Sequence, residues 1–237
     1  MDELVTDLEG TANADLPRLS PAHIDLNRAA LYRWFARLFF TTASETEVID
    51  LRAGRMRAVL ESLAMTPGAE EPVAAICRAL DHGSAASVAA SLGVARTRLF
   101  DGIGGNQTTP PYRSVFTSDS GLLCQEATVE MEQVLRQYVL KLDESVCEPA
   151  DHLSLQLEVM SQLALCAAVE TEATGAAAGH FLVGQANFID RQLLDWVPRF
   201  AGRLAEVDEF GFHAGLAAVL VLILQQDRAY LAELIDA

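Results

Sequence analysis

The sequence predicts an all-α fold: a single helical, bundle-like domain of about nine or ten helices. Apolar residues recur at helical spacing over most of the chain. Sustained apolar/polar alternation is nearly absent, and no Asn-Gly dipeptide marks a hairpin. Hydrophobic residues make up 51% of the 237 residues, so the chain can bury a sizeable core.

The first helices are predicted from their start signals. Residues 1–19 hold few large apolar groups and are predicted to form a flexible acidic tail. Ser20-Pro21 then opens a helix, with serine as the N-cap and proline at the first helical position. The segment 44–47, Ser-Glu-Thr-Glu, fits a capping box, and Pro67-Gly68 would end the helix that it begins.

Later helices are predicted from apolar stripes. The helix that begins at Pro149 is apolar on two faces, which is typical of a central helix. The loop 101–111 is rich in Gly and Pro, and 114–121 is predicted to be extended or irregular. The remaining helices are expected over 73–80, about 86–100, 127–142, 182–196 and from about 210 to near the chain end.

The main seam of the chain is predicted at residues 143–149. It would divide the helical domain, 20–237, into an N-terminal lobe of about 20–142 and a C-terminal lobe of about 149–237. A hinge at this seam would allow a mainly monomeric protein to form a minor domain-swapped dimer.

The charge of the chain narrows the class of partner. The formal net charge is −16, from 33 acidic and 17 basic side chains. Such a surface repels phosphate backbones, so nucleic acid is not expected as a partner, whereas basic segments are favoured. The alternative interpretation is that the charge serves solubility alone.

The apolar segments predict a cytoplasmic protein without stable membrane insertion. The first residues, MDELVTDLEG, carry acids where a secretory leader has a basic and then an apolar stretch. The most apolar run, 214–224, is too short to span a bilayer and is interpreted as part of a buried core helix.

No metal or cofactor is expected. The four cysteines, at 77, 124, 147 and 166, include no CxxC pair and no zinc-finger spacing with histidine. They are interpreted as buried, reduced thiols.

Catalytic motifs are also lacking. The GIGGN segment at 102–106 follows a predicted helix and lacks the spacing of a dinucleotide fingerprint, and 175–179 lacks the lysine of a phosphate-binding loop. The proximity of His152 and Ser154 in sequence is weak support for a catalytic triad. We therefore predict that the protein is not an enzyme.

The segment Glu148-Pro149-Ala150-Asp151-His152 stands out because acids, proline and imidazole crowd a predicted helix start. In one interpretation Asp151 lies in the first helical turn and interacts with the helix dipole, while His152 makes a structural hydrogen bond. In the other interpretation, Asp151 and His152 belong to a binding site.

Together these segments resemble the TorD/DmsD family, which includes the NarJ-like chaperones. The similarity covers roughly residues 21–235. It lies in LYRWFARLFF (31–40), in the Leu-Phe pair at 99–100, in PPYRSVF (110–116), in EPADHLSLQLEVM (148–160) and in WVPRF (196–200).

This resemblance implies an all-helical cytoplasmic chaperone without catalytic turnover. Its partners would be the apo catalytic subunit of a molybdenum oxidoreductase and the twin-arginine signal peptide of that subunit. It would aid cofactor insertion and delay export. The positions that match the leader-binding residues of the family are Leu99, Phe100, Tyr112, Ser114, Asp151 and His152.

The sequence departs from the family pattern at two places. Arg96 stands where many relatives have an aromatic residue, and Gln156-Leu157 replaces the expected Glu-Leu pair, with an acid following at Glu158. These differences bear on which enzyme is the client.

The chemistry of a twin-arginine leader fits the matched positions. The leader joins two arginines to an apolar segment. Leu99, Phe100 and Tyr112 could form the apolar walls of a groove, and Asp151 could accept a charge-assisted hydrogen bond from arginine. Two rival functions remain at this point: a guanine-nucleotide-binding hydrolase, and a helical adaptor with an unrelated client.

Overall fold

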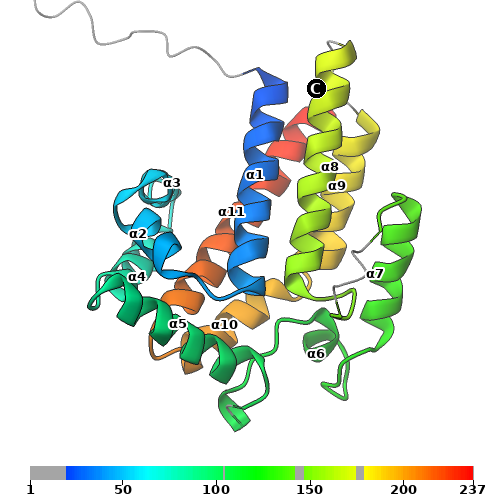
Figure 1. Ribbon diagram of the computed structural model, residues 1–237. Coiled ribbons are helices and arrows are strands. Elements are labelled where there is room, and N and C mark those ends of the chain that lie inside the picture. Colours follow the sequence, from blue (N-terminus) through cyan, green and yellow to red (C-terminus); the bar gives the residue numbers. More distant parts are fainter. Residues whose placement is uncertain (1–19, 104, 142–146, 175–178, 237) are drawn as a thin grey trace, which may run out of the picture.

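The computed structural model describes residues 20–103, 105–141, 147–174 and 179–236, and every named secondary-structure element in this part is a helix (Figure 1). The all-α prediction is therefore confirmed. In chain order the helices are α1 (Pro21–Phe40), α2 (Glu45–Ala53), α3 (Arg55–Leu63), α4 (Glu70–Leu80), α5 (Ala85–Phe100), the 3₁₀ turn η1 (Gly105–Gln107), α6 (Arg113–Thr117), α7 (Glu126–Gln137), α8 (Leu153–Thr174), α9 (Gly179–Phe188), the π-helical η2 (Ile189–Leu193), α10 (Val197–Val207) and α11 (Phe212–Asp236).

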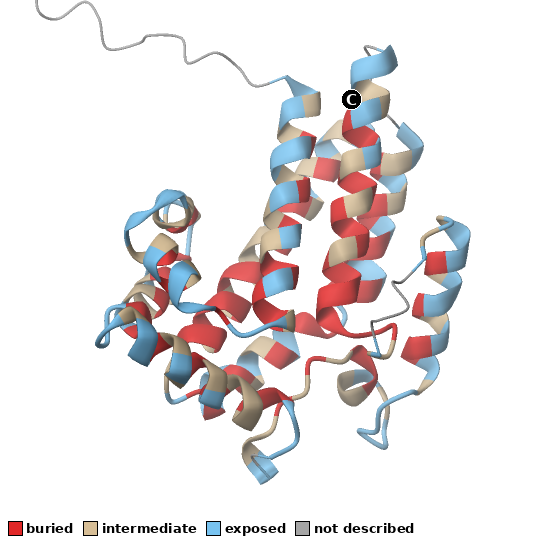
Figure 2. Ribbon diagram, viewed as in Figure 1, coloured by how far each residue is buried: buried red, intermediate tan, exposed pale blue. Residues whose placement is uncertain are grey.

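The centre of the fold is the pair α1 and α8, which lie side by side, with α11 crossing behind them (Figure 1). Figure 2 shows their facing sides buried. Helix α8 is buried on most of its residues, which confirms the predicted central helix. The hydroxyl of Ser161 on α8 donates a 2.8 Å hydrogen bond to the carbonyl of Ala29 on α1, so the two backbones pack closely.

Helix α11 crosses α4 at a glycine. A Cβ atom at Gly215 would lie 2.7 Å from the carbonyl oxygen of Pro72 and 2.8 Å from a side-chain carbon of Ile76. Only the missing side chain allows this approach, because real Cβ contacts are not that short. The glycine therefore places α11 against α4.

The first two helix starts follow the sequence signals. The Ser20 hydroxyl accepts a hydrogen bond from the amide of His23, and Ser44 forms the predicted capping box with Glu47. The chain after Ser44, however, forms two helices where one was predicted. It breaks at Gly54, where a Cβ atom would lie 1.9 Å from a carboxylate oxygen of Asp50.

Two further boundaries correct the sequence prediction. The segment 114–121, expected to be irregular, begins with the helix α6. The helix expected from Pro149 begins at Leu153, after a turn over 150–151. With the break at Gly54, the described residues contain eleven α-helices, slightly more than predicted.

The predicted tail, 1–19, lies outside the described residues, and so does most of the seam at 143–149. The division into lobes of about 20–142 and 149–237 stays a prediction. In the described part, α1 from the first of these lobes packs along α8 from the second.

Two helices, α8 and α11, are long and apolar enough to cross a membrane by length and composition. Core helices of soluble proteins share these properties. The most apolar window of α8 is 67% buried within the protein and that of α11 is 44% buried. The length and apolar composition of α8 and α11 are therefore weak support for a membrane span.

Candidate functional site

The structure brings together two of the segments that the sequence analysis selected. Tyr112, just before α6, and His152, just before α8, form an isolated antiparallel β-bridge. The amide of Arg113 donates to the carbonyl of Asp151 at 3.2 Å, and the amide of Leu153 donates to the carbonyl of Pro111 at 2.8 Å. We call this pairing of 111–114 with 151–153 the junction.

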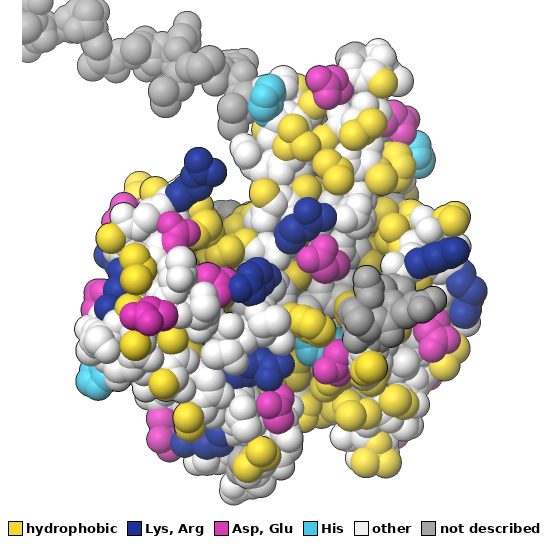
Figure 3. Space-filling view, viewed as in Figure 1, with side chains coloured by type: hydrophobic (Ala, Val, Ile, Leu, Met, Phe, Trp, Pro, Cys, Tyr) yellow, Lys and Arg dark blue, Asp and Glu magenta, His cyan; other side chains and the backbone are white. Residues whose placement is uncertain are grey.

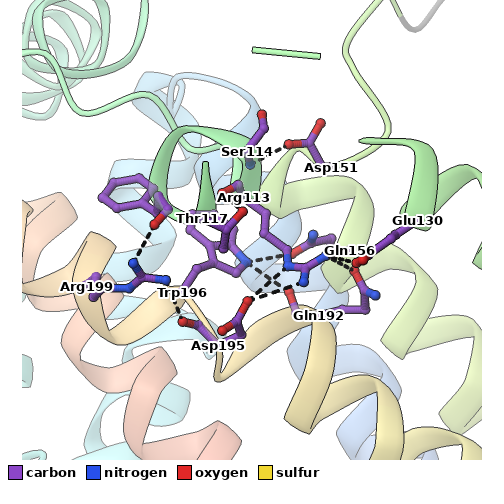
Figure 4. Close-up of polar contacts among 11 residues, drawn as sticks. Arg113, Ser114, Thr117, Glu130, Asp151, Gln156, Gln192, Asp195, Trp196 and Arg199 are labelled. Atoms are coloured by element: carbon purple, nitrogen blue, oxygen red, sulfur yellow. Dashed lines mark hydrogen bonds and ion pairs between the residues drawn. The ribbon is translucent and has the colours of Figure 1, made fainter. Parts of the chain in front are cut away.

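Asp151 is fully buried at the junction, and its carboxylate ties three elements together. Figure 4 shows its bond to Ser114. One carboxylate oxygen accepts a 2.8 Å hydrogen bond from the amide of Ser114 in the first turn of α6. The other accepts a 2.6 Å hydrogen bond from the hydroxyl of Thr128 on α7. The sequence interpretation placed Asp151 in the first turn of its own helix; instead it satisfies a free amide at the start of α6.

His152 is buried beside Asp151 and is held as a neutral ring. Its Nδ1 atom accepts a 3.1 Å hydrogen bond from the amide of Ser154, and its ring packs edge-on against Phe40 and Tyr112. Burial lowers the pKa of His152 to about 4, and the positive charge of Arg96 contributes in the same direction. A neutral imidazole at pH 7 fits the structural hydrogen bond of the first interpretation.

Tyr112 is the one matched position that is partly exposed. Its hydroxyl donates a short hydrogen bond to the carboxylate of Glu148. Burial raises the pKa of Tyr112, and the bond to Glu148 raises it further, so the phenol remains a donor. Tyr112 and Glu148 thus form the outer edge of the junction.

Leu99 and Phe100 lie in the aromatic core at the end of α5. The Phe100 ring contacts the rings of Phe39, Phe200 and His213. Both residues are buried, so in this conformation they form no open apolar wall. Apolar side chains gather instead on the surface around α6 and the loop after it (Figure 3), where Leu122 and Leu123 are exposed.

Arg113 lies in the family-like segment 110–116 but was not among the predicted site residues. Its guanidinium group bonds the carboxylate of Glu130 on α7, the side-chain amide oxygen of Gln192 in η2 and the carboxylate of Asp195 (Figure 4). These partners are 17 to 82 residues away along the chain. No local spacing could therefore have revealed the network.

The departure at Gln156 has a local physical account. The indole nitrogen of Trp196 donates to the side-chain oxygen of Gln156 at 3.1 Å and to the carbonyl of Gln192 at 2.9 Å. Trp196 and Gln156 are both fully buried. A neutral amide at this position accepts the indole hydrogen bond without bringing a charge into the core.

The cysteines correct the sequence interpretation. Cys77 is half-buried, but Cys124, Cys147 and Cys166 are exposed, because they lie in loops or on the outer face of α8. Within the described residues, no group of three His, Cys, Asp or Glu side chains has the geometry to hold a metal ion.

Comparisons with known proteins agree on one family. The model of the nitrate reductase delta subunit family matches residues 63–202. The chaperone protein TorD of Vibrio parahaemolyticus is 31% identical over 86% of this chain and 94% of its own length. TorD of Vibrio cholerae (strain ATCC 39541) is 31% identical over 88% of this chain and 94% of its own length.

Among solved structures, a putative redox enzyme maturation protein from Archaeoglobus fulgidus is 19% identical to this chain. The match has a TM-score of 0.43 and covers 93% of this chain and 99% of the other.

The family model and the two Vibrio relatives each span more than half of the chain. They show that the chain belongs to the family of nitrate reductase delta subunits and TorD chaperones, and that it is a chaperone and not an enzyme.

Proposed function

We propose that this chaperone binds the immature catalytic subunit of a molybdenum oxidoreductase, together with the twin-arginine leader of that subunit, in the cytoplasm. It would hold the subunit for cofactor insertion and delay its export. The observation that carries the proposal is the similarity to TorD chaperones over nearly their whole length.

The matched positions would then act in two different ways. Tyr112 is partly exposed beside Glu148 and is the member of the set that can touch a client directly. Leu99, Phe100, Ser114, Asp151 and His152 are buried, so we infer that they position the surface around the junction. Asp151 would do so through its hydrogen bonds to α6 and α7.

Copurification tests the client. The tagged full-length chain is expressed in its native host and recovered, and the bound proteins are identified by mass spectrometry. We expect enrichment of a molybdopterin-dependent catalytic subunit that lacks its cofactor and still carries its leader. Recovery of no such subunit, or of an unrelated protein in stoichiometric amount, would contradict the proposal.

The role of the junction is tested in the same experiment with Tyr112→Ala. This change removes the exposed ring and its hydrogen bond to Glu148. It should reduce client recovery about tenfold. The control is Tyr230→Ala, because Tyr230 lies on α11, near Arg28 of α1, and not at the junction. Equal recovery with both variants would remove Tyr112 from the client-binding surface.

We also infer a mainly monomeric protein with a minor domain-swapped dimer. Light scattering at micromolar concentration is expected to show a main species of about the 25.6 kDa chain mass. A single tight dimer would contradict this inference.

A further inference from the structure

A groove of about 1010 Å³ separates α7 from α9 and η2. Helix α7 stands apart from the central helices in Figure 1, and it forms one wall of this groove. The opposite wall comes from α9 and η2, and Arg113 reaches the groove from α6. The groove thus lies directly beside the junction, but it contains none of the positions that the sequence analysis selected.

At this end of the groove, one guanidinium group is shared by two carboxylates. The Arg113 side chain is only 11% exposed, whereas those of Glu130 and Asp195 are 41% and 43% exposed. The three groups together carry one excess negative charge. The exposed carboxylate oxygens can therefore accept hydrogen bonds from a second cation.

Asp190 and Arg191 also line the groove. Asp190 is paired with Arg228 of α11 at 2.8 Å. Arg191 is exposed. Its positive charge formally balances the excess, but among the described residues Arg191 forms no ion pair with Glu130 or Asp195, so their exposed oxygens stay open to a ligand.

The walls of the groove supply apolar contact. Val134 of α7 and Val183 of α9 line it, and Val183 is 46% exposed. At Gly184 a Cβ atom would lie 2.6 Å from the hydroxyl oxygen of Tyr138, so the glycine lets the end of α7 approach α9. A ligand that fits this groove combines a cation with apolar side chains.

The backbone of η2 is an independent sign of function. Residues Ile189–Leu193 form a π-helix, closed by a 2.8 Å hydrogen bond from the amide of Leu194 to the carbonyl of Ile189. Short π-helices are rare in proteins, and those that occur often lie at functional sites. This one supplies Asp190, Arg191 and Gln192 to the groove.

We propose that the groove between α7 and α9 binds an arginine-bearing, partly apolar peptide segment. The incoming guanidinium group would bond the exposed oxygens of Glu130 and Asp195, while its apolar neighbours pack on Val134 and Val183. The inference rests on the proposed function, because the segment is taken to be the arginine-containing leader of the client.

Calorimetry with a synthetic peptide tests the inference. The peptide carries two adjacent arginines followed by an apolar stretch, and a second peptide has glutamine in place of both arginines. We expect the double variant Glu130→Gln/Asp195→Asn to bind the arginine peptide at least about tenfold more weakly than the wild type. Its affinity for the glutamine peptide should match that of the wild type within about twofold.

Two further variants keep the test specific. Glu132→Gln, also on α7, removes an acid that pairs with Arg136 and does not line the groove, so it should change the affinity by less than about twofold. Val183→Trp keeps every acid but fills the groove, and it should weaken binding of both peptides. Thermal melts verify that each variant is folded.

The outcomes separate the two proposals. Wild-type affinity in the folded double variant, or no binding of the arginine peptide to the wild type, overturns the groove as the leader site. Neither result affects recovery of the client from the native host, which tests the chaperone assignment by itself. If no molybdenum oxidoreductase subunit is recovered, the proposed function falls, whatever the peptides show.

Discussion

Two buried arginines, Arg28 and Arg113, each bond two carboxylates, but these carboxylates differ in their exposure to solvent. On α1, the Arg28 side chain is 10% exposed and bonds Asp25 and Asp227, whose side chains are 6% and 8% exposed. Beside α7, Arg113 is equally buried, but both of its carboxylate partners are nearly half exposed. Each network has one guanidinium group and two carboxylates, and only the second opens to solvent.

The difference shows which network can take part in binding. Around Arg28, Tyr32 and Gln185 also bond to the charged groups, so the buried charges are enclosed by protein partners. Burial raises the pKa of Asp25, although the nearby Arg28 opposes that rise. The Arg28 network joins α1, α9 and α11 and is structural, whereas the Arg113 network has carboxylate oxygens left for a ligand.

The largest expected effect comes from Arg28→Met. It leaves two buried carboxylates without their cation, which should lower the free energy of unfolding by about 3–5 kcal/mol. Urea denaturation at pH 7 measures this loss. The matched control on the same helix is Arg33→Met, whose side chain is 57% exposed and lies 3.6 Å from Glu158. This control should lower the free energy of unfolding by less than about 0.5 kcal/mol. Equal losses in the two variants would show that the Arg28 network does not stabilise the fold more than an exposed ion pair does.

Asp151→Ala should be next in size. It removes the acceptor for the Ser114 amide and the Thr128 hydroxyl. The free energy of unfolding, measured by urea denaturation, should fall by about 2–3 kcal/mol. Thr128→Val removes one of the two bonds and should cost about 1 kcal/mol. Asp119→Ala, in the exposed loop after α6, should cost less than about 0.5 kcal/mol. A cost for Asp151→Ala as small as that for Asp119→Ala would contradict the role of Asp151 in holding α6 and α7.

Arg113→Met sharpens the comparison directly. The carboxylates of Glu130 and Asp195 stay partly hydrated when the guanidinium group is removed, so the expected loss is only about 1–2 kcal/mol. The measurement is the same denaturation series as for Arg28→Met. A loss of unfolding free energy as large as that for Arg28→Met would mean that both networks stabilise the fold equally, despite the difference in exposure.

The smallest expected effect depends on pH and comes from His152. Its folded-state pKa of about 4 lies below the unfolded-state value, so the unfolded chain binds more protons in mild acid. The stability that the neutral ring contributes is complete above about pH 6.5 and is lost as the pH falls towards 4. When the pH falls from 7 to 6, protonation linked to His152 should lower the free energy of unfolding by about 0.7 kcal/mol.

The matched variant is His152→Asn, whose side-chain oxygen can accept the hydrogen bond from the Ser154 amide. His213, whose pKa burial also lowers to about 4, is present in both proteins. The difference between their pH profiles therefore isolates His152. Parallel profiles between pH 7 and pH 5 would show that His152 is not buried as a neutral ring.

The sequence by itself determined the features that depend on near neighbours along the chain. The N-cap at Ser20, the capping box at Ser44 and the central position of α8 all follow from residues a few positions apart. Hydrogen bonds at a helix start and the faces of a helix are set within one or two turns, so local spacing is sufficient to predict them. The motif residues that indicated the family likewise lie in short, continuous segments of the chain.

Only the tertiary structure decided what those motif residues touch. Asp151 was interpreted from its own helix, yet its carboxylate bonds Ser114 and Thr128, 37 and 23 residues away. The groove beside α7 depends on Arg113, Glu130 and Asp195, which meet only after α6, α7 and the turn that follows η2 have packed. A buried charge takes whichever partner the fold brings within hydrogen-bonding distance, and that choice is made by packing and not by spacing in the sequence.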